Sequence, residues 1–384
     1  MFSTYIVMIQ TSCFFLCKNN YSTSSIGKSF KHMFNLNNSL FIHLNQNSKY
    51  LLKSLILVYM DSNKLKEIIP IEQIWINLEN FESRLYEISG SEDSYLNEIS
   101  HYLINAGGKR FRPICTLLAG ELGNGDNNKI IDAAVAIELI HLGSLYHDDV
   151  IDDAETRRGV ESANVKWNTT LSILAGDYLL AKSSELAAET LGLESVKLLA
   201  STYAELVEGQ TKEVQYQYDT DHTTEDYMKV IEGKTASLIR TSAKLGAMAG
   251  NCDKKTTNAI SKWAWHNGII FQITDDILDL SSDTQTLGKE AGKDILEGTY
   301  TLPVLIALSE NKDKVKKILT GIRNSEIELL EVIQEFNNEK IIDASKKYLD
   351  HHYKESMKSL DAIEDSKIKE ILIDINNYLI KRSN

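Results

Sequence analysis

The sequence predicts an all-α fold, for three reasons. Apolar residues recur at intervals of three and four within residues 130–154 and 170–191, which places them along one side of a helix. Only three prolines interrupt the 384 residues, so long helices are permitted. We find no convincing alternation of apolar and polar residues of the kind that a half-buried strand shows. The length allows one large domain or two ordinary ones.

Charge and cysteine content argue against two classes of protein. The net charge is −13, which disfavours general binding of nucleic acid through its phosphate backbone. The four cysteines, at positions 13, 17, 115 and 252, do not follow the spacing of a disulfide framework. We therefore expect a compartment in which thiols stay reduced.

Residues 1–59 differ in composition from residues 60–384, which we expect to form the folded domain. The extension contains no Asp, Glu or Arg and five Lys. The lack of acidic residues suits a transit peptide to a mitochondrion or plastid, although such peptides are usually rich in Arg. The first 17 residues could instead be signal-like, and residues 51–60 are too short to span a bilayer. If Met60 is the true start, we expect a cytoplasmic bacterial protein.

A cationic segment, "NAGGKRFRP", occupies residues 105–113. Its two glycines permit backbone conformations that other residues avoid, and its proline suits the start of a helix. Three cations meet at this helix start: Lys109, Arg110 and Arg112. Guanidinium groups and free backbone N–H groups together can hold a polyvalent anion. Taken alone, the segment could also be a solvated basic turn.

A first acidic cluster, "HDDVIDDAETRRG", occupies residues 147–159. Asp148 and Asp152 are four residues apart, so on a helix their carboxylates project from the same face. With Asp149 beside them, they suit a hard divalent cation. Such a run alone could be a solvated helix face. Arg157 and Arg158 reverse the charge immediately afterwards.

A second cluster, "FQITDDILDL" at residues 271–280, repeats the spacing with Asp275, Asp276 and Asp279. Its neighbours are apolar, and buried carboxylates without a partner are unfavourable, so this trio implies a counter-charge or a cation. The two clusters are 127 residues apart (148 to 275) and could face each other across a helix bundle. Two metal clusters with several Arg and Lys describe a pocket for diphosphates.

Three further segments fit such a pocket. Lys234 and Thr235 stand in "EGKTASLIRTSAKLGA", which we expect to be one long helix. Gln272 lies three residues before the second cluster, on a face that could reach the same place. The following stretch contains Gly, Lys289 and Lys293, and could close over an anionic substrate. Each could equally be an ordinary helix or loop residue.

A competing hypothesis also predicts an all-α fold. Glu98 and His101, and again Glu138 and His141, match the E-x-x-H pattern of di-iron helix bundles. That hypothesis leaves both aspartate clusters and "GGKRFRP" unexplained. We therefore assign His141 to the diphosphate pocket.

Over roughly residues 75–384 the chain resembles the trans-isoprenyl diphosphate synthases, or polyprenyl synthetases. The likeness is carried, in order, by "GGKRFRP", "HDDVIDDAETRRG", "AGDYLL", "EGKTASL", "FQITDDILDL" and "GKDILEGTYTLP". The resemblance implies a single large helical bundle around a deep cavity, a homodimer, and roughly three Mg²⁺ ions per site. It departs at Thr299, where many relatives have Lys, and this puts one cation of the closing loop in doubt.

The resemblance also assigns roles to individual residues. It implies that the metal is held by Asp148, Asp149, Asp152, Asp275, Asp276 and Asp279. The allylic diphosphate would be held by Arg157, Lys234, Thr235, Gln272 and Lys289, and isopentenyl diphosphate by Lys109, Arg112, His141 and Arg158. Catalysis would rest on Asp148, Asp152, Asp275 and Lys234.

The implied reaction joins isopentenyl diphosphate to an allylic diphosphate, head to tail, and lengthens the apolar tail by five carbons each time. Two alternatives remain. A binding subunit of a two-protein prenyl synthase would usually have lost aspartates from one cluster, and a terpene cyclase would usually have a second metal motif based on Asn, Ser and Glu.

Product length should depend on the floor beneath the growing tail. Residues 130–152 are expected to form one helix, so Gly143 and Ser144 would lie about one turn below Asp148. Short-chain members of the family usually have a bulky aromatic residue there. Small residues predict a long product of roughly six to ten isoprene units, suited to a quinone side chain and delivered to a membrane. A farnesyl- or geranylgeranyl-length product is the alternative, if Tyr146 or Ile137 closes the tunnel earlier.

Overall fold

The computed structural model describes residues 64–281 and 292–382. The chain divides into a unit of residues 1–56 and a unit of residues 57–384, and every described residue belongs to the second. The predicted boundary at residue 59 therefore lies outside the described residues.

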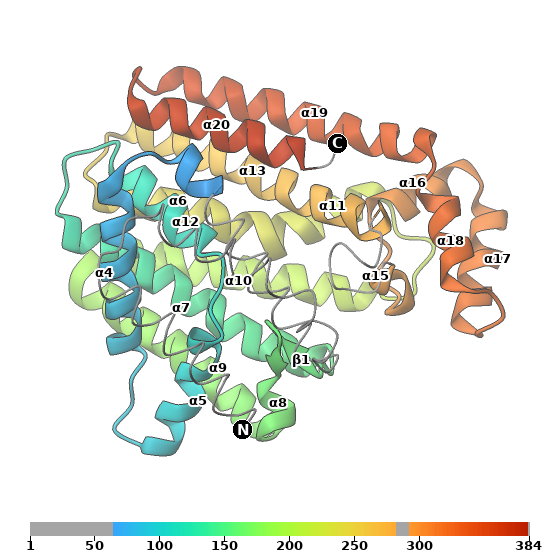
Figure 1. Ribbon diagram of the computed structural model, residues 1–384, viewed down its shortest axis with the longest axis horizontal. Helices are drawn as coiled ribbons and strands as arrows, with labels where there is room; N and C mark the ends of the chain where they lie inside the picture. The colour runs from blue at the N-terminus through green and yellow to red at the C-terminus, as the bar shows by residue number, and fades with distance from the viewer. Residues whose placement is uncertain (1–63, 282–291, 383–384) are drawn as a thin grey trace, which may run out of the picture. The chain divides into compact units, whose positions relative to one another are not determined.

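The described part is built almost entirely from helices, so the all-α prediction is confirmed (Figure 1). The first half contains α4 (Glu72–Ile88), α5 (Ser94–Asn105), α6 (Phe111–Gly120), α7 (Asn127–Ile151), β1 (Thr156–Arg157), β2 (Val160–Glu161), α8 (Ala163–Lys166), α9 (Thr169–Leu186), η2 (Ala187–Leu191) and α10 (Leu193–Tyr216). The second half contains α11 (Thr224–Ile231), η3 (Glu232–Ala236), α12 (Ser237–Ala249), α13 (Lys254–Ser281), α15 (Lys293–Leu296), α16 (Leu302–Glu310), α17 (Lys312–Arg323), α18 (Leu329–Phe336), α19 (Glu339–Ser359), η4 (Leu360–Ala362) and α20 (Lys367–Lys381).

Two long helices carry the acidic clusters, α7 the first and α13 the second. Between them in the packing order lie α6 and α12, because α7 packs on α6, α6 on α12, and α12 on α13. On the far side of α7 lies α9, and on the far side of α13 lie α19 and α20 (Figure 1). The bundle thus holds the two acidic helices in fixed positions relative to each other.

Helix α7 runs through the middle of the bundle. Its most apolar 18-residue window is 83% buried among other helices, so its length and hydropathy, which would also suit a membrane span, are those of a core helix. The helix starts at Asn127 and is capped by Asp126, whose side chain accepts a hydrogen bond from the Asn128 backbone N–H. It ends at Ile151, within the first acidic cluster. The prediction of a single helix over residues 130–152 is confirmed to within one residue.

The structure adds a short hairpin that the sequence pattern did not predict. Strand β1 pairs antiparallel with β2, and the two residues between them, Arg158 and Gly159, both have positive φ, of 54° and 79°. A two-residue hairpin turn requires this backbone conformation. The turn directs Arg157 and Arg158 to different partners.

The segment 232–247, predicted as one long helix, contains a π-helical turn. η3 spans Glu232–Ala236, between α11 and α12. Here the backbone of Gly233 touches α10, since a Cβ at Gly233 would lie 2.9 Å from the Gly209 Cα. Two glycines in contact allow this close approach, and π-turns are frequent at functional sites. Lys234 and Thr235 stand within the turn.

Candidate active site

The three aspartates of the first cluster that we expected to hold a metal do not share one role. Asp148 and Asp152 face the same region, and burial raises the pKa of each, to about 6 for Asp148. Lys234 opposes this shift in both. Asp149 is fully buried on another side and accepts a hydrogen bond of 2.6 Å from Arg157 Nε. The pair Asp148 and Asp152 is thus the part of the cluster that the geometry offers to a cation.

The second cluster divides in the same way. Asp276 is 3% exposed and accepts hydrogen bonds from Tyr227 Oη (2.5 Å) and Gln272 Nε2 (2.9 Å). Burial, followed by the nearby Asp294, raises the pKa of Asp276 to about 8. Asp275 is more exposed and lies 3.1 Å from Arg382 Nη2, at the end of α20. Asp279 stands one turn further along α13.

Lys234 links the two clusters. Its side chain is bonded to Glu213 of α10, and although burial works against the charged form, Glu213, Asp148 and Asp152 together raise its pKa. Next to it, Thr235 Oγ1 donates to Gln272 Oε1 over 2.8 Å, and Gln272 in turn contacts Asp276. Polar contacts therefore join η3 to α10 through Lys234 and to α13 through Thr235, while the charge of Lys234 acts on Asp148 and Asp152 at the end of α7.

Some of these groups line a cavity of about 220 Å³. Its lining combines predicted and unpredicted residues: Asp152, Glu213, Tyr227, Lys234, Thr235, Gln272, Asp276, Asp294, Thr299 and Tyr300. Five of the predicted site residues, from three segments of the chain, thus meet in one place: Asp152, Lys234 with Thr235, and Gln272 with Asp276. Lys289 lies outside the described residues, while Lys293 forms an ion pair of 2.9 Å with Glu297.

The predicted cationic corner is partly assembled. Arg112 Nη1 lies 3.2 Å from His141 Nε2, so α6 and α7 bring these two together. Burial, followed by the charge of Arg112, lowers the pKa of His141 well below its usual range, so the imidazole is neutral. Arg158 donates to the backbone carbonyls of Leu103 and Gly107, which ties the hairpin to the "GGKRFRP" segment.

Gly108 provides the space for Arg158. A Cβ at Gly108 would lie 3.1 Å from the Arg158 guanidinium carbon, and its φ of +159° is at the edge of the range that side chains tolerate. Arg158 is half-buried, and the burial of its guanidinium lowers its pKa to about 10, so it remains charged at neutral pH. Gly108 therefore makes room for Arg158 beside the "GGKRFRP" segment.

Arg110 does not join this corner. Its φ of 50° turns the side chain away from Arg112, and its guanidinium pairs with Glu82 (2.6 Å) and Glu138 (3.1 Å). This buried contact anchors α6 to α4 and α7. The grouping of Arg110 with Lys109 and Arg112 as anion-binding cations is therefore corrected for Arg110.

The di-iron hypothesis finds no support. Glu138 binds Arg110, and His101 contacts the Tyr86 backbone carbonyl at 2.9 Å while its ring stacks on Tyr86. Among residues 64–281 and 292–382, no three Asp, Glu, His or Cys side chains converge as a cage for one ion.

An apolar cavity of about 600 Å³ begins beside Asp148. Its lining comes from α7, α9 and α10 and includes Ser144, Ile151, Ile173, Leu206 and Val207. Ser144, one of the two predicted floor residues, lies in this lining. Gly143 instead faces α9, because a Cβ there would lie 2.9 Å from the Gly176 carbonyl oxygen.

The acidic residues fit magnesium shared with a diphosphate. Mg²⁺ takes one or two carboxylates from a protein and completes its shell with water and phosphate oxygens. Asp148 and Asp152 form such a pair. Burial disfavours their charged forms and raises their pKa values, and a bound cation would favour the charged forms again. A cage of three protein ligands is not needed for such an ion.

Four residues at or near the site were missed by sequence reasoning. They are Glu213, Tyr227, Asp294 and Arg382. Asp294 stands next to Lys293 in a segment already singled out, so it could have been found. The others stand in helices that are unremarkable in sequence.

Comparison of the sequence with known proteins identifies its family. The polyprenyl synthetase profile matches residues 93–338. The chain is 36% identical to heptaprenyl diphosphate synthase component 2 of Geobacillus stearothermophilus over 301 residues, covering 78% of this chain and 94% of that protein. It is 36% identical to nonaprenyl diphosphate synthase of Mycobacterium tuberculosis (76% and 88% covered) and 33% identical to geranylgeranyl diphosphate synthase of Methanosarcina mazei (78% and 92% covered).

Solved structures agree. A decaprenyl diphosphate synthase from Rhodobacter capsulatus superimposes with a TM-score of 0.76 at 27% identity, over 84% of this chain and 99% of that one. A polyprenyl synthase from Caulobacter crescentus, solved with calcium and isoprenyl diphosphate, gives 0.70 at 26% identity, over 87% and 98%. The chain belongs to the polyprenyl synthetase family and is a prenyltransferase, a polyprenyl diphosphate synthase.

Proposed function

We propose that the enzyme condenses isopentenyl diphosphate with an allylic diphosphate in the presence of Mg²⁺ and makes a long trans-polyprenyl diphosphate. The observation that carries the proposal is the position of Asp148. Its carboxylate lies near Asp152 and Lys234, and it also lines the mouth of the apolar cavity. A diphosphate bound at this carboxylate would have its apolar tail at the entrance of that cavity.

The side chains divide the work between the two substrates. Lys234, Thr235 and Gln272 line the polar cavity and would hold the allylic diphosphate, with Mg²⁺ bound by Asp148, Asp152 and Asp275. Bound Mg²⁺ would withdraw electrons from the diphosphate and make it a better leaving group. Lys234 would stabilise the charge that develops on the departing oxygen.

Isopentenyl diphosphate would bind at the cationic corner with Arg112, His141, Lys109 and Arg158. As the allylic C–O bond breaks, its electron pair leaves with the diphosphate. The double bond of isopentenyl diphosphate supplies the electrons of the new C–C bond. A proton is then lost from the coupled product to the departing diphosphate, which restores a double bond.

The apolar cavity supports a long product. About 600 Å³ is open beside Ser144, and the small side chain leaves the first turn below Asp148 unobstructed. Two of the relatives are named for long products, heptaprenyl and nonaprenyl diphosphate, and one for the shorter geranylgeranyl diphosphate. We favour the long chain because of Ser144, and a quinone side chain as its use.

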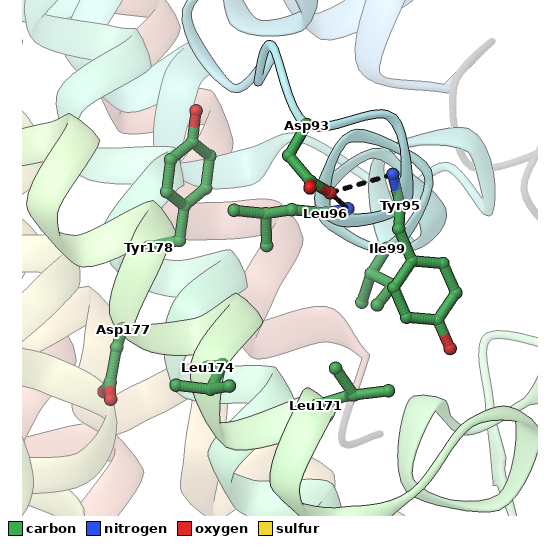
Figure 2. A pocket seen from close by; sticks show the side chains of 8 residues that line it. All are labelled: Asp93, Tyr95, Leu96, Ile99, Leu171, Leu174, Asp177 and Tyr178. Carbon is green, nitrogen blue, oxygen red and sulfur yellow. Dashed lines mark hydrogen bonds between the residues drawn. The ribbon is translucent and has the colours of Figure 1, made fainter.

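We further propose that the enzyme acts as a homodimer. Figure 2 shows a third cavity, of about 480 Å³, between α5 and α9 and lined by Tyr95, Leu96, Leu171, Leu174 and Tyr178 among others. Leu174 is 52% exposed. Its neighbour Ile173, which lines the apolar cavity beside Asp148, is 41% exposed. An apolar surface of this kind on α9 is what a second copy would cover.

The decisive experiment is turnover by the purified protein alone. Incubation with radiolabelled isopentenyl diphosphate, farnesyl diphosphate and Mg²⁺ should give a prenyl product, and reverse-phase chromatography should show its length. The variants Asp148→Ala and Asp275→Ala should retain helical circular dichroism and lose most turnover. If the wild type is inactive alone and gains activity only with a second protein, the chain is one component of a heteromeric synthase, as the name of its Geobacillus relative states for that protein.

A further inference from the structure

The C-terminal helix brings a cation to the second acidic cluster. Arg382 Nη2 lies 3.1 Å from Asp275 Oδ1, and the two residues are 107 positions apart in the chain. The guanidinium also lies over the Phe271 ring, 5.5 Å from its centre. Phe271 in turn stacks on Phe111, the neighbour of Arg112, with ring centres 6.0 Å apart. Arg382 thus stands between the second acidic cluster and the cationic corner.

A buried polar seam fixes α20 in this position. Asn267 of α13 donates to Ser356 Oγ of α19 over 2.7 Å, and Ser356 donates to Asn376 of α20 over 3.1 Å. All three residues are fully buried, so these contacts set the register of the helices. From this seam α13 and α20 run in the same direction and deliver Asp275 and Arg382 to the same end (Figure 1).

The charge of Arg382 opposes a second cation on Asp275. Like charges within about 5 Å repel appreciably even at the dielectric of a protein surface. The side chains of Arg382 and Asp275 are only 23% and 39% exposed, so water screens this repulsion incompletely. A diphosphate reverses the balance, because its negative charge attracts both the metal ion and the guanidinium.

We propose that Arg382 makes cation binding at Asp275 depend on the presence of a diphosphate. Arg382 weakens binding of the cation alone at Asp275 and strengthens binding of the cation in complex with a diphosphate. This inference rests on the proposed function, since it assumes that Asp275 binds a metal in the reaction.

The test uses Mn²⁺ as the probe and electron paramagnetic resonance of free Mn²⁺ as the readout, with no turnover required. Arg382→Ala should bind Mn²⁺ alone roughly two- to fivefold more tightly than the wild type, the range expected for one partly exposed charge pair. With inorganic pyrophosphate present, the wild type should bind Mn²⁺ at least as tightly as the variant. Arg382→Lys, which keeps the charge, should behave as the wild type in both titrations.

Lys381→Ala is the matched control, because it removes the same charge from the adjacent, exposed position. It should leave Mn²⁺ binding unchanged. Equal or weaker Mn²⁺ binding by Arg382→Ala, or tighter binding by Lys381→Ala as well, would overturn the role of Arg382. If the wild type makes prenyl product but the variants bind Mn²⁺ in this contrary way, only the inference about Arg382 is refuted. The proposed function is refuted as well if the wild type shows no turnover, alone or with a second protein, and binds no Mn²⁺ in the presence of pyrophosphate.

Discussion

Tyr227 on α11 and Asp276 on α13 are joined by a hydrogen bond of 2.5 Å, with both side chains buried. Tyr227 donates its hydroxyl proton to one carboxylate oxygen, and Gln272 donates to the other. Because α11 leads directly into the π-turn with Lys234, this contact fixes the lysine relative to the second acidic cluster. We therefore expect Asp276 to position its neighbours, while Asp275 meets the cation.

Tyr227→Phe should lower the free energy of unfolding by about 1–3 kcal/mol, because it leaves a buried carboxyl oxygen without its donor. It should also lower kcat, since Lys234 loses part of its support. Urea unfolding and steady-state kinetics measure the two effects. Tyr353→Phe, which removes a hydroxyl contact to Asn377 far along α19, is the control and should change stability alone. A Tyr227→Phe protein as stable and active as the wild type would contradict this role.

The two substrates should respond to different cations. Arg112→Ala should raise the KM for isopentenyl diphosphate, and Lys234→Ala should chiefly impair use of the allylic substrate. Loss of one charged contact to phosphate weakens binding by about 1.5–3 kcal/mol. Arg84→Ala, which breaks a contact to Asp132 outside the site, should change neither KM. Uniform effects of both site variants on both substrates would undo the division of the pocket.

Product length should depend on Ser144. Ser144→Phe should place a ring in the apolar cavity and shorten the product toward fifteen or twenty carbons, roughly three or four isoprene units, by filling open volume. Gly143→Phe is the comparison, and should instead destabilise the fold, because its side chain would meet the Gly176 carbonyl and Leu180. Chromatography of the products and thermal unfolding separate the two outcomes. An unchanged long product from a folded Ser144→Phe enzyme would place the floor elsewhere.

The pH dependence of stability should reflect His352. Burial, followed by the neighbouring His266 and His351, lowers the pKa of His352 from 6.5 to about 4. Between those values the unfolded chain binds a proton that the folded protein does not, so stability is complete above pH 6.5 and falls as the pH is lowered. From pH 7 to pH 5 the loss should be about 1–2 kcal/mol from this group.

Urea unfolding at several pH values tests this. His352→Asn should flatten the dependence between pH 7 and pH 5, whatever its effect on stability at pH 7. Identical slopes for His352→Asn and the wild type would show that other groups account for the pH dependence.

The spacing of residues predicted much of this molecule. The period of apolar residues predicted α7, and the four-residue interval from Asp148 to Asp152 predicted a shared face, because both follow from helix geometry alone. Contacts between distant segments could not be predicted in this way. Arg110 and Arg112 are equivalent in sequence, yet a single left-handed residue sends one to Glu82 and the other to His141.

The same limit applies to the acidic clusters. Spacing treats Asp275 and Asp276 alike, and only the packing of α11 and α20 shows that one meets Tyr227 and the other Arg382. Similarly, small residues at 143 and 144 are compatible with an open tunnel or with close helix packing. The rotation of α7 relative to α9 determines the outcome: Gly143 packs against α9, and Ser144 lines the apolar cavity.

Gly108 leaves the space that the Arg158 side chain occupies, so we expect these two positions to change together in evolution. Any larger residue at 108 would push the guanidinium aside and weaken its hydrogen bonds to the carbonyls of Leu103 and Gly107. A substitution at 158 to a short side chain would in turn leave a hollow that a larger residue at 108 could fill. Among homologous sequences, glycine at 108 should therefore covary with arginine at 158, and single exchanges at either position should be rarer than paired ones.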